Sequence, residues 1–370
     1  MIGVSVSLSL CVFLQAQTPI ADGSKLDGKA EFQCRLPVLG LFSIQCSVRY
    51  KIVNKIFEGG MGVVYEAEQH GASGFIKRVA IKVIRQSYAN QKLFIENFIG
   101  EAKLVADLIH TNIVQTYHLG ETDGMFFIAM ELIRGANVEQ FLQKCQEQKR
   151  QLPKELAVFI ASRIARGLAY AHAKTDKDGK TLSIVHRDVN LKNVMIAFEG
   201  DVKVTDFGIA KARGLLQDQE GEVVAGKVDY MSPEQSNFQI TDKRSDVFSL
   251  GIVLAQMLLG YNVFKGASMS ESRDRVQAMA IPDFRTLDSR IDEPLNKVLQ
   301  KCLERDLARR YPNADEVLHD LEHYIYHAGY GPTNETMGRF IRQLYGQVDY
   351  KQIQEAKGKT QRIERVARPV

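Results

Sequence analysis

Three polar side chains stand at fixed intervals in one short stretch, and their spacing limits what this chain can fold into. Asp188 and Asn193 are five residues apart, and Asp206 follows thirteen residues after Asn193. Between Asn193 and Asp206, apolar residues alternate over 194–196 and again over 202–204, which is the pattern of two short paired strands. Such a hairpin brings Asp206 back beside the loop that carries Asp188.

These three side chains suit phosphoryl transfer. In that reaction one carboxylate orients a hydroxyl nucleophile, while a second carboxylate and an amide hold magnesium against the phosphates. At this point the sequence resembles the protein kinase family, because His186–Asn193 and Asp206–Gly208 match its His-Arg-Asp…Asn and Asp-Phe-Gly elements. The landmarks of that family follow in order over residues 49–326, and the segments Gly59–Tyr65 and Tyr230–Gln235 resemble bacterial kinases of the eukaryotic Ser/Thr type.

The resemblance implies an α+β, bilobal protein kinase fold. We expect a small lobe over 49–133, with a five-stranded antiparallel sheet and one helix, and a larger, mostly helical lobe over 134–326. Residues 1–48 form an N-terminal extension of unknown structure, and 327–370 form a C-terminal tail. Periodicity predicts strands at 50–56, 63–68, 78–84, 113–118 and 125–130, and helices at 92–108, 153–173, 243–259, 294–304, 313–326 and 337–344.

A glycine-rich turn joins the first two predicted strands. Because Gly59, Gly60 and Gly62 have no Cβ atoms, their backbone amides can approach phosphate oxygens closely. The family pattern places its first glycine where this chain has Phe57, so we expect altered nucleotide affinity or altered closure of the turn.

The resemblance also implies where ATP binds. Met130 would be the bulky residue at the back of the adenine pocket, and the backbone of Glu131 and Ile133 would bond the edge of adenine. The full set of nucleotide contacts that it implies is Ile56, Glu58, Gly59, Gly60, Met61, Gly62, Val64, Ala80, Lys82, Glu101, Met130, Glu131, Ile133, Asn137 and Met195.

The remaining implied residues carry the chemistry. Lys82 lies in an apolar strand, so it needs a partner, and Glu101 in the following helix is the natural one. In the resembled family this lysine holds the α and β phosphates of ATP. Asp188 would orient the substrate hydroxyl and accept its proton, and Asn193 and Asp206 would bind Mg²⁺ through hard oxygen atoms.

The chain departs from the family pattern beside Asp188. Ser/Thr kinases usually have a lysine two residues after this aspartate, and here Asn190 stands there. Lys227 follows Gly226, where the family usually has Thr or Ser, so our hypothesis is that Lys227 reaches back and restores the missing charge. Lys192, four residues after Asp188 where tyrosine kinases have an arginine, is the competing donor.

The segment between Gly208 and Tyr230 contains no Ser, Thr or Tyr. Phosphorylation that orders an activation loop through arginine pairing therefore has no acceptor in this segment. We predict that activity does not need prior phosphorylation there. Arg187 then pairs with an acid of the segment (Asp218, Glu220 or Glu222) or stays unpaired.

Two more matches to the family are structural. Ser232–Glu234 resembles the Ala-Pro-Glu element, for which the resemblance implies Arg310 as the buried partner of Glu234. Asp246–Gly251 resembles the start of the helix that anchors the catalytic loop, with Phe248 where tryptophan is usual.

Composition indicates which classes of partner and compartment to expect. A net charge of +4 on a chain with 48 basic and 44 acidic side chains does not favour nucleic acid, so we expect protein substrates. The five cysteines show neither a zinc-site spacing nor a disulfide pattern. Residues 1–14 form an apolar run that lacks a positively charged n-region and is too short to span a bilayer as a helix. We expect a cytoplasmic protein, with export or membrane association through residues 1–16 as the alternative.

Three functions fit these observations. The first is a protein kinase that uses ATP and Mg²⁺ and acts on Ser or Thr, which retention of Lys82, Glu101, Asp188, Asn193 and Asp206 favours. The second is a pseudokinase scaffold that binds nucleotide or partners without catalysis, which Phe57 and Asn190 favour. The third, tyrosine specificity, is suggested only by Lys192.

Overall fold

The computed structural model describes residues 48–59, 62–84, 92–122, 124–207 and 228–347. Among the helical residues of 92–105, the side chain of Glu101 is not described. The predicted extension before Val48, the positions Gly60, Met61 and Lys227, and the end of the tail after Gln347 therefore lie outside the described residues.

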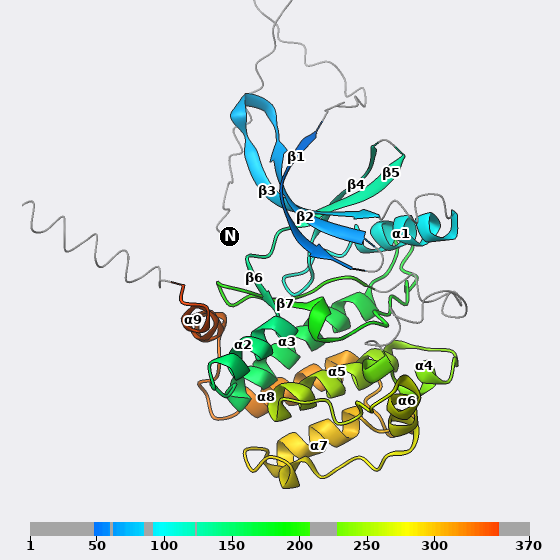
Figure 1. Cartoon of the computed structure of the whole chain (residues 1–370). Coiled ribbons are helices and arrows are strands. Elements are labelled where there is room, and N and C mark those ends of the chain that lie inside the picture. The colour runs from blue at the N-terminus through cyan, green and yellow to red at the C-terminus, as the bar shows by residue number, and fades with distance from the viewer. Residues whose placement is uncertain (1–47, 60–61, 85–91, 123, 208–227, 348–370) are drawn as a thin grey trace, which may run out of the picture. The chain divides into compact units, whose positions relative to one another are not determined.

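The small lobe is the predicted five-stranded antiparallel sheet with one helix. Its strands have the spatial order β1-β2-β3-β5-β4, and helix α1 lies beside the sheet (Figure 1). The bounds are β1 Arg49–Glu58, β2 Gly62–His70, β3 Ile76–Ile84, α1 Lys92–Val105, β4 Thr116–Thr122 and β5 Met125–Glu131. The buried stretch of β3 is rich in Val and Ile, residues whose branched side chains pack well on the pleated surface of a sheet.

The larger lobe is mostly helical, as predicted, and carries a short three-stranded sheet with the order β6-β7-β8. Its elements are β6 Gly135–Asn137, α2 Val138–Glu147, α3 Lys154–Ala173, β7 Val194–Ala197, β8 Val202–Val204, α4 Pro233–Ser236, α5 Lys243–Leu259, α6 Met269–Ala278, α7 Glu293–Cys302, α8 Ala314–Tyr326 and α9 Asn334–Leu344. Helix α5 is buried on nearly every side and forms the centre of this lobe.

One predicted strand begins later than the sequence suggested. We expected a strand from Ile113, but β4 starts at Thr116. The backbone around Ile113 bonds to β8 instead, because Val114 N donates to Val204 O (2.9 Å) and Val204 N donates to Asn112 O (2.9 Å). Ile113 and Val114 are both buried, so the backbone groups of this stretch need protein partners, and β8 of the large lobe supplies them.

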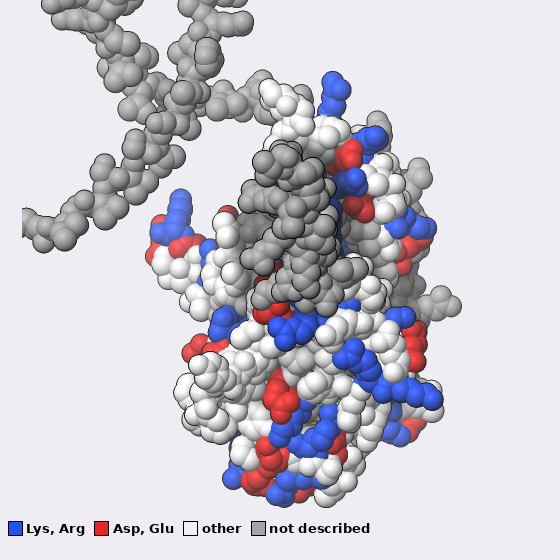
Figure 2. Space-filling view, turned by 90° about the vertical axis from the view of Figure 1, so that its left-hand side faces the viewer, with Lys and Arg blue, Asp and Glu red and all other residues white. Residues whose placement is uncertain are grey.

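The surface of the chain carries charges of both signs. Acidic and basic side chains are interspersed on the face shown in Figure 2, in keeping with the small net charge of the chain. Within the described ranges, every helix is too short or too polar to cross a bilayer.

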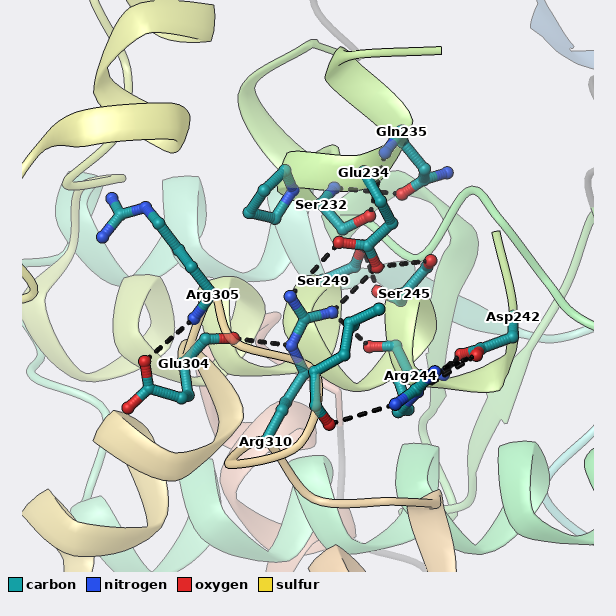
Figure 3. A network of polar contacts seen from close by, with 12 residues as sticks. Ser232, Glu234, Gln235, Asp242, Arg244, Ser245, Ser249, Glu304, Arg305 and Arg310 are labelled. Carbon is teal, nitrogen blue, oxygen red and sulfur yellow. Dashed lines mark hydrogen bonds and ion pairs between the residues drawn. The ribbon is translucent and has the colours of Figure 1, made fainter. Parts of the chain in front are cut away.

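A buried ion pair holds the start of α4 against the rest of the large lobe. Arg310 bonds both carboxylate oxygens of Glu234, at 2.8 and 3.2 Å, which confirms the predicted pairing. Ser245 of α5 also donates to this carboxylate, at 2.7 Å (Figure 3). Burial would raise the pKa of Glu234, but the hydrogen bonds and charge of Arg310 bring it below its usual value. The glutamate therefore remains ionised inside the protein.

Arg310→Met should destabilise the fold strongly, because it leaves the Glu234 carboxylate buried without its cation. We expect the free energy of unfolding to fall by about 3–5 kcal/mol, measured by urea denaturation. The matched control is Lys297→Met on α7, which removes an ion pair with Glu293 whose side chains are 72% and 48% exposed. That change should cost about 1 kcal/mol or less, and equal losses in the two variants would contradict a special role for the buried pair.

Candidate active site

The loop that carries Asp188 is fastened to helix α5 by one buried carboxylate. Asp246 accepts hydrogen bonds from the backbone amides of His186 (2.8 Å) and Arg187 (2.7 Å), and from the ring of His172 (2.8 Å). Burial alone would raise the pKa of Asp246, but the bond and charge of His172 and the other donors bring it below its usual value. The charge therefore stays on Asp246 and holds two consecutive amides of the loop.

The carboxylate of Asp188 is held by two amide side chains. Asn190 Nδ2 lies 3.1 Å from Oδ1, and Asn193 Nδ2 lies 3.1 Å from Oδ2. Each amide group also donates to the backbone carbonyl of Asp188, at 2.9 Å. Asp188 is therefore fixed in position from both sides.

Asn190 has a structural role that sequence reasoning missed. Its Oδ1 accepts from the backbone amides of Lys192 (2.9 Å) and Asn193 (3.3 Å), so it caps the single helical turn Leu191–Asn193. Asparagine is among the preferred residues at such a position, and that preference was the available signal. The residue that replaces the family lysine thus orders the loop around Asp188.

Lys82 and Asp206 meet across the two lobes. Lys82 Nζ lies 2.8 Å from Asp206 Oδ1, and the lysine is 9% exposed. The predicted partner of Lys82, the carboxylate of Glu101, is outside the described side chains. Asp206 has a left-handed backbone (φ 56°), an unusual conformation for a residue other than glycine.

The segment before Asp206 is tied to the catalytic loop. Thr205 N donates to Asn193 O (3.0 Å), and the ring of His186 bonds Thr205 O (3.0 Å). The site therefore brings together side chains from three places in the chain. Lys82 comes from strand β3, Asp188 and Asn193 come from the loop before β7, and Asp206 follows the β7–β8 hairpin.

The donor set of this site fits Mg²⁺. Asp206 offers a carboxylate, and Asn193 offers an amide oxygen, because its Nδ2 is bonded to Asp188. Carboxylate and amide oxygens are the hard ligands that this ion prefers.

Strand register places several predicted nucleotide contacts opposite one another. Val64 is paired with Lys82 between β2 and β3, and Ala80 with Met130 between β3 and β5. In the large lobe, Asn137 of β6 is paired with Met195 of β7. Ile133 lies between β5 and β6, in the segment that joins the lobes.

The side chain of Glu131 fixes the segment where the lobes join. Its Oε2 accepts from Gln115 N (3.2 Å) and lies 3.0 Å from Lys203 Nζ of β8. Sequence reasoning assigned only the backbone of Glu131 and missed Lys203. A cavity of about 30 Å³ is lined by residues that include Lys82, Met130 and Phe207.

The described part of the glycine-rich turn shows where Phe57 lies. Gly59 N donates to Gly62 O (2.9 Å), and Glu58 pairs with Lys55 at 3.0 Å. The Phe57 ring lies against Gly59, since a Cβ built there would be 2.8 Å from it. Ile56 and Phe57 are both about half exposed.

Of the two lysines that could replace the missing lysine at position 190, only Lys192 lies in the described residues. Lys192 is 60% exposed, and its Nζ lies 3.7 Å from the carboxylate of Glu139 on α2. Lys227 lies outside the described residues, as do the acids predicted to pair with Arg187. Arg187 Nε donates to Thr241 Oγ1 (3.1 Å).

His186 is a completely buried titratable group of the site. The amide of Asp188 donates to its Nδ1 (3.2 Å), so the hydrogen-bond network assigns the proton of the neutral ring to Nε2, which bonds Thr205 O. Burial lowers the pKa of His186 below 6.5, which keeps the ring neutral.

Stability should fall as the pH drops below about 6.5, because the unfolded chain then binds a proton that folded His186 excludes. The slope from this one group is at most about 1.4 kcal/mol per pH unit, and partly buried His110, whose pKa burial also lowers, adds to it. Urea denaturation at a series of pH values measures this slope of the unfolding free energy with pH. His186→Phe should reduce the slope and exposed His319→Ala should keep it. An unchanged slope in His186→Phe would contradict the assignment.

Comparisons with known proteins agree on one family. Residues 50–321 match the protein kinase domain. The chain is 33% identical over 298 residues to the tyrosine-protein kinase MasK of Myxococcus xanthus, covering 80% of this chain and 46% of that protein. It is 34% identical over 283 residues to the serine/threonine-protein kinase PrkC of Bacillus subtilis, covering 76% and 41%.

The match to solved structures supports the fold. The kinase domain of Mycobacterium tuberculosis PknI aligns with a TM-score of 0.55 at 24% identity, covering 74% of this chain and 95% of that one. The chain spans less than half the length of the two curated relatives above. Because the matched domain covers residues 50–321, most of the chain, the chain belongs to the protein kinase family.

Proposed function

We propose that the chain is an active protein kinase that transfers the γ-phosphate of Mg-ATP to Ser or Thr hydroxyls of protein substrates. The observation that carries the proposal is the position of Asp188, whose carboxylate is held by two amides beside the Lys82–Asp206 ion pair. Bound Mg²⁺ would neutralise charge that develops on the phosphates. Asp206 and Asn193 would hold it there.

Each side chain has a distinct task in this proposal. Asp188 orients the substrate hydroxyl and accepts its proton during transfer. The ammonium of Lys82, which now lies on Asp206, holds the α and β phosphates of ATP. The stretch between Glu131 and Asn137 receives adenine and ribose, and Met195 and Ala80 close on the ring from the two lobes.

The activation segment needs no phosphate in this proposal, since residues 209–229 include no hydroxyl acceptor. Arg187 already donates to Thr241, which supports an ordering of the loop that does not depend on a phosphate.

A second acceptor class also has support. The relative named as a tyrosine kinase is 33% identical to this chain, and Lys192 stands where tyrosine kinases have an arginine. Acceptor identity is therefore part of the test below.

Asp188→Asn should abolish phosphate transfer, because the amide cannot accept the hydroxyl proton. We expect a loss of about 10²–10⁴-fold or more, measured with labelled ATP, Mg²⁺ and a basic protein substrate. Analysis of the labelled amino acids should show phosphoserine or phosphothreonine, whereas phosphotyrosine would assign the second acceptor class. Phosphatase treatment of the enzyme beforehand should leave the rate unchanged.

The matched control is Asp178→Asn, an exposed acid in the surface turn 174–180, which should transfer at the wild-type rate. Transfer by Asp188→Asn at the control rate would overturn the assignment of Asp188. Nucleotide binding without transfer by the wild type would instead establish the pseudokinase alternative.

Lys227→Ala should reduce kcat by about 10²-fold if Lys227 supplies the charge that Asn190 lacks. Lys192→Ala should have a small effect, because the Lys192 ammonium is exposed and already paired with Glu139 on α2. Steady-state kinetics of the two variants decide between them. A large drop in Lys192→Ala alone would assign the role to Lys192, and no clear drop in either would end the exchange hypothesis.

A further inference from the structure

Helix α9 lies outside the residues that match the kinase domain, which end at 321, yet it completes the core of the large lobe. Met337, Ile341 and Leu344 are fully buried along one side of it. Thr333 begins the helix with a reciprocal cap on Thr336. In Figure 1 α9 lies beside α2, on the side of the lobe where β6 and β7 lie.

The first contact of α9 is with the turn between β7 and β8. Arg342 Nη1 donates to Phe198 O (2.8 Å), and Asn334 Nδ2 donates to Asp201 Oδ1 (2.6 Å). Gly200 in the turn has φ 95°, and a Cβ built on it would collide with the backbone of α9. A Cβ on Gly338 would lie 2.7 Å from Glu199 O. Helix and turn therefore approach so closely that each needs glycine at the contact.

The second contact is with α2. The rings of Phe340 and Phe141 meet edge to face, with centroids 5.8 Å apart. Gln148 Nε2 donates to Leu344 O (2.6 Å), which satisfies a carbonyl at the end of α9. Arg150 covers the outer face of the Phe340 ring, at 4.7 Å from its centroid.

These two contacted elements are the ones that present the large-lobe residues of the nucleotide site. Asn137 caps α2 through Gln140 N (2.8 Å), and it is paired with Met195 of β7 across the short sheet. Helix α9 thus contacts both the β7–β8 turn and, through Phe141 and Gln148, helix α2 and its C-terminal cap.

We propose that α9 is a positioning element for nucleotide binding, which sets Met195 and Asn137 by clamping the β7–β8 turn against α2. The inference rests on the proposed function, in which this site binds ATP. Coupling of this kind is reciprocal, so bound nucleotide must also stabilise the docked helix. The functional kinase unit would then extend to the end of α9.

Gly338→Ala in the full chain tests the proposal. In a free helix this change would be stabilising, but here the added methyl meets Glu199 O. We expect the Kd for Mg-ATP, measured by calorimetry, and the KM for ATP to rise about 5-fold or more, with kcat nearly unchanged. The control is Arg339→Ala on the exposed side of α9, which should bind ATP as the wild type does. Arg342→Met, which removes the bond to Phe198 O, serves if Gly338→Ala does not fold.

Hydrogen exchange of the α9 amides with and without a non-hydrolysable Mg-ATP analogue gives a second readout. Protection of α9 in the wild type should rise when the analogue binds. Unchanged Kd and unchanged protection would overturn the proposal and leave α9 a purely structural helix. A wild-type chain that binds no nucleotide in calorimetry would instead refute the proposed function, so the two failures are distinct.

Discussion

The buried carboxylate of Asp246 is the constraint on which the catalytic loop depends. An ionised carboxylate inside an apolar core is tolerated only when several donors surround it. Two of its donors are the backbone amides of His186 and Arg187 in the loop. The same hydrogen bonds that stabilise the charge therefore also hold the loop in place. The left-handed backbone of Arg187 (φ 60°) is kept in place by the same bonds. Asp188 therefore starts from a backbone whose position the core of the large lobe sets.

Two side-chain amides, those of Asn190 and Asn193, also hold the loop in place around Asp188. Asn190 both caps the turn after Asp188 and donates to its carboxylate, while Asn193 donates to the other oxygen. A lysine at position 190 could not accept the capping bonds, since an ammonium has only donors. The departure from the family pattern thus replaces a positive charge with a side chain that orders the turn after Asp188.

Much of the architecture could be predicted because it rests on local patterns. Alternation over 194–204 indicated the hairpin, and the apolar run of 243–259 indicated a buried helix with the observed bounds. The strand at 113–118 was predicted to begin three residues too early, because Ile113 pairs with Val204 about ninety positions away, and no local periodicity records such a partner. The capping role of Asn190 was missed because it depends on the direction of one amide.

The sequence by itself determined the family and predicted which residues carry the chemistry, because phosphoryl transfer needs particular groups at particular spacings and the chain has these groups in that order. The pairing of Glu234 with Arg310 was predictable in the same way, through the resemblance. Tertiary structure alone decided that α9 docks on α2 and the β7–β8 turn, since an amphipathic helix shows that it has a partner but not which one. It also decided the contact of Gly200 with Gly338, because the need for two glycines arises only where two backbones meet.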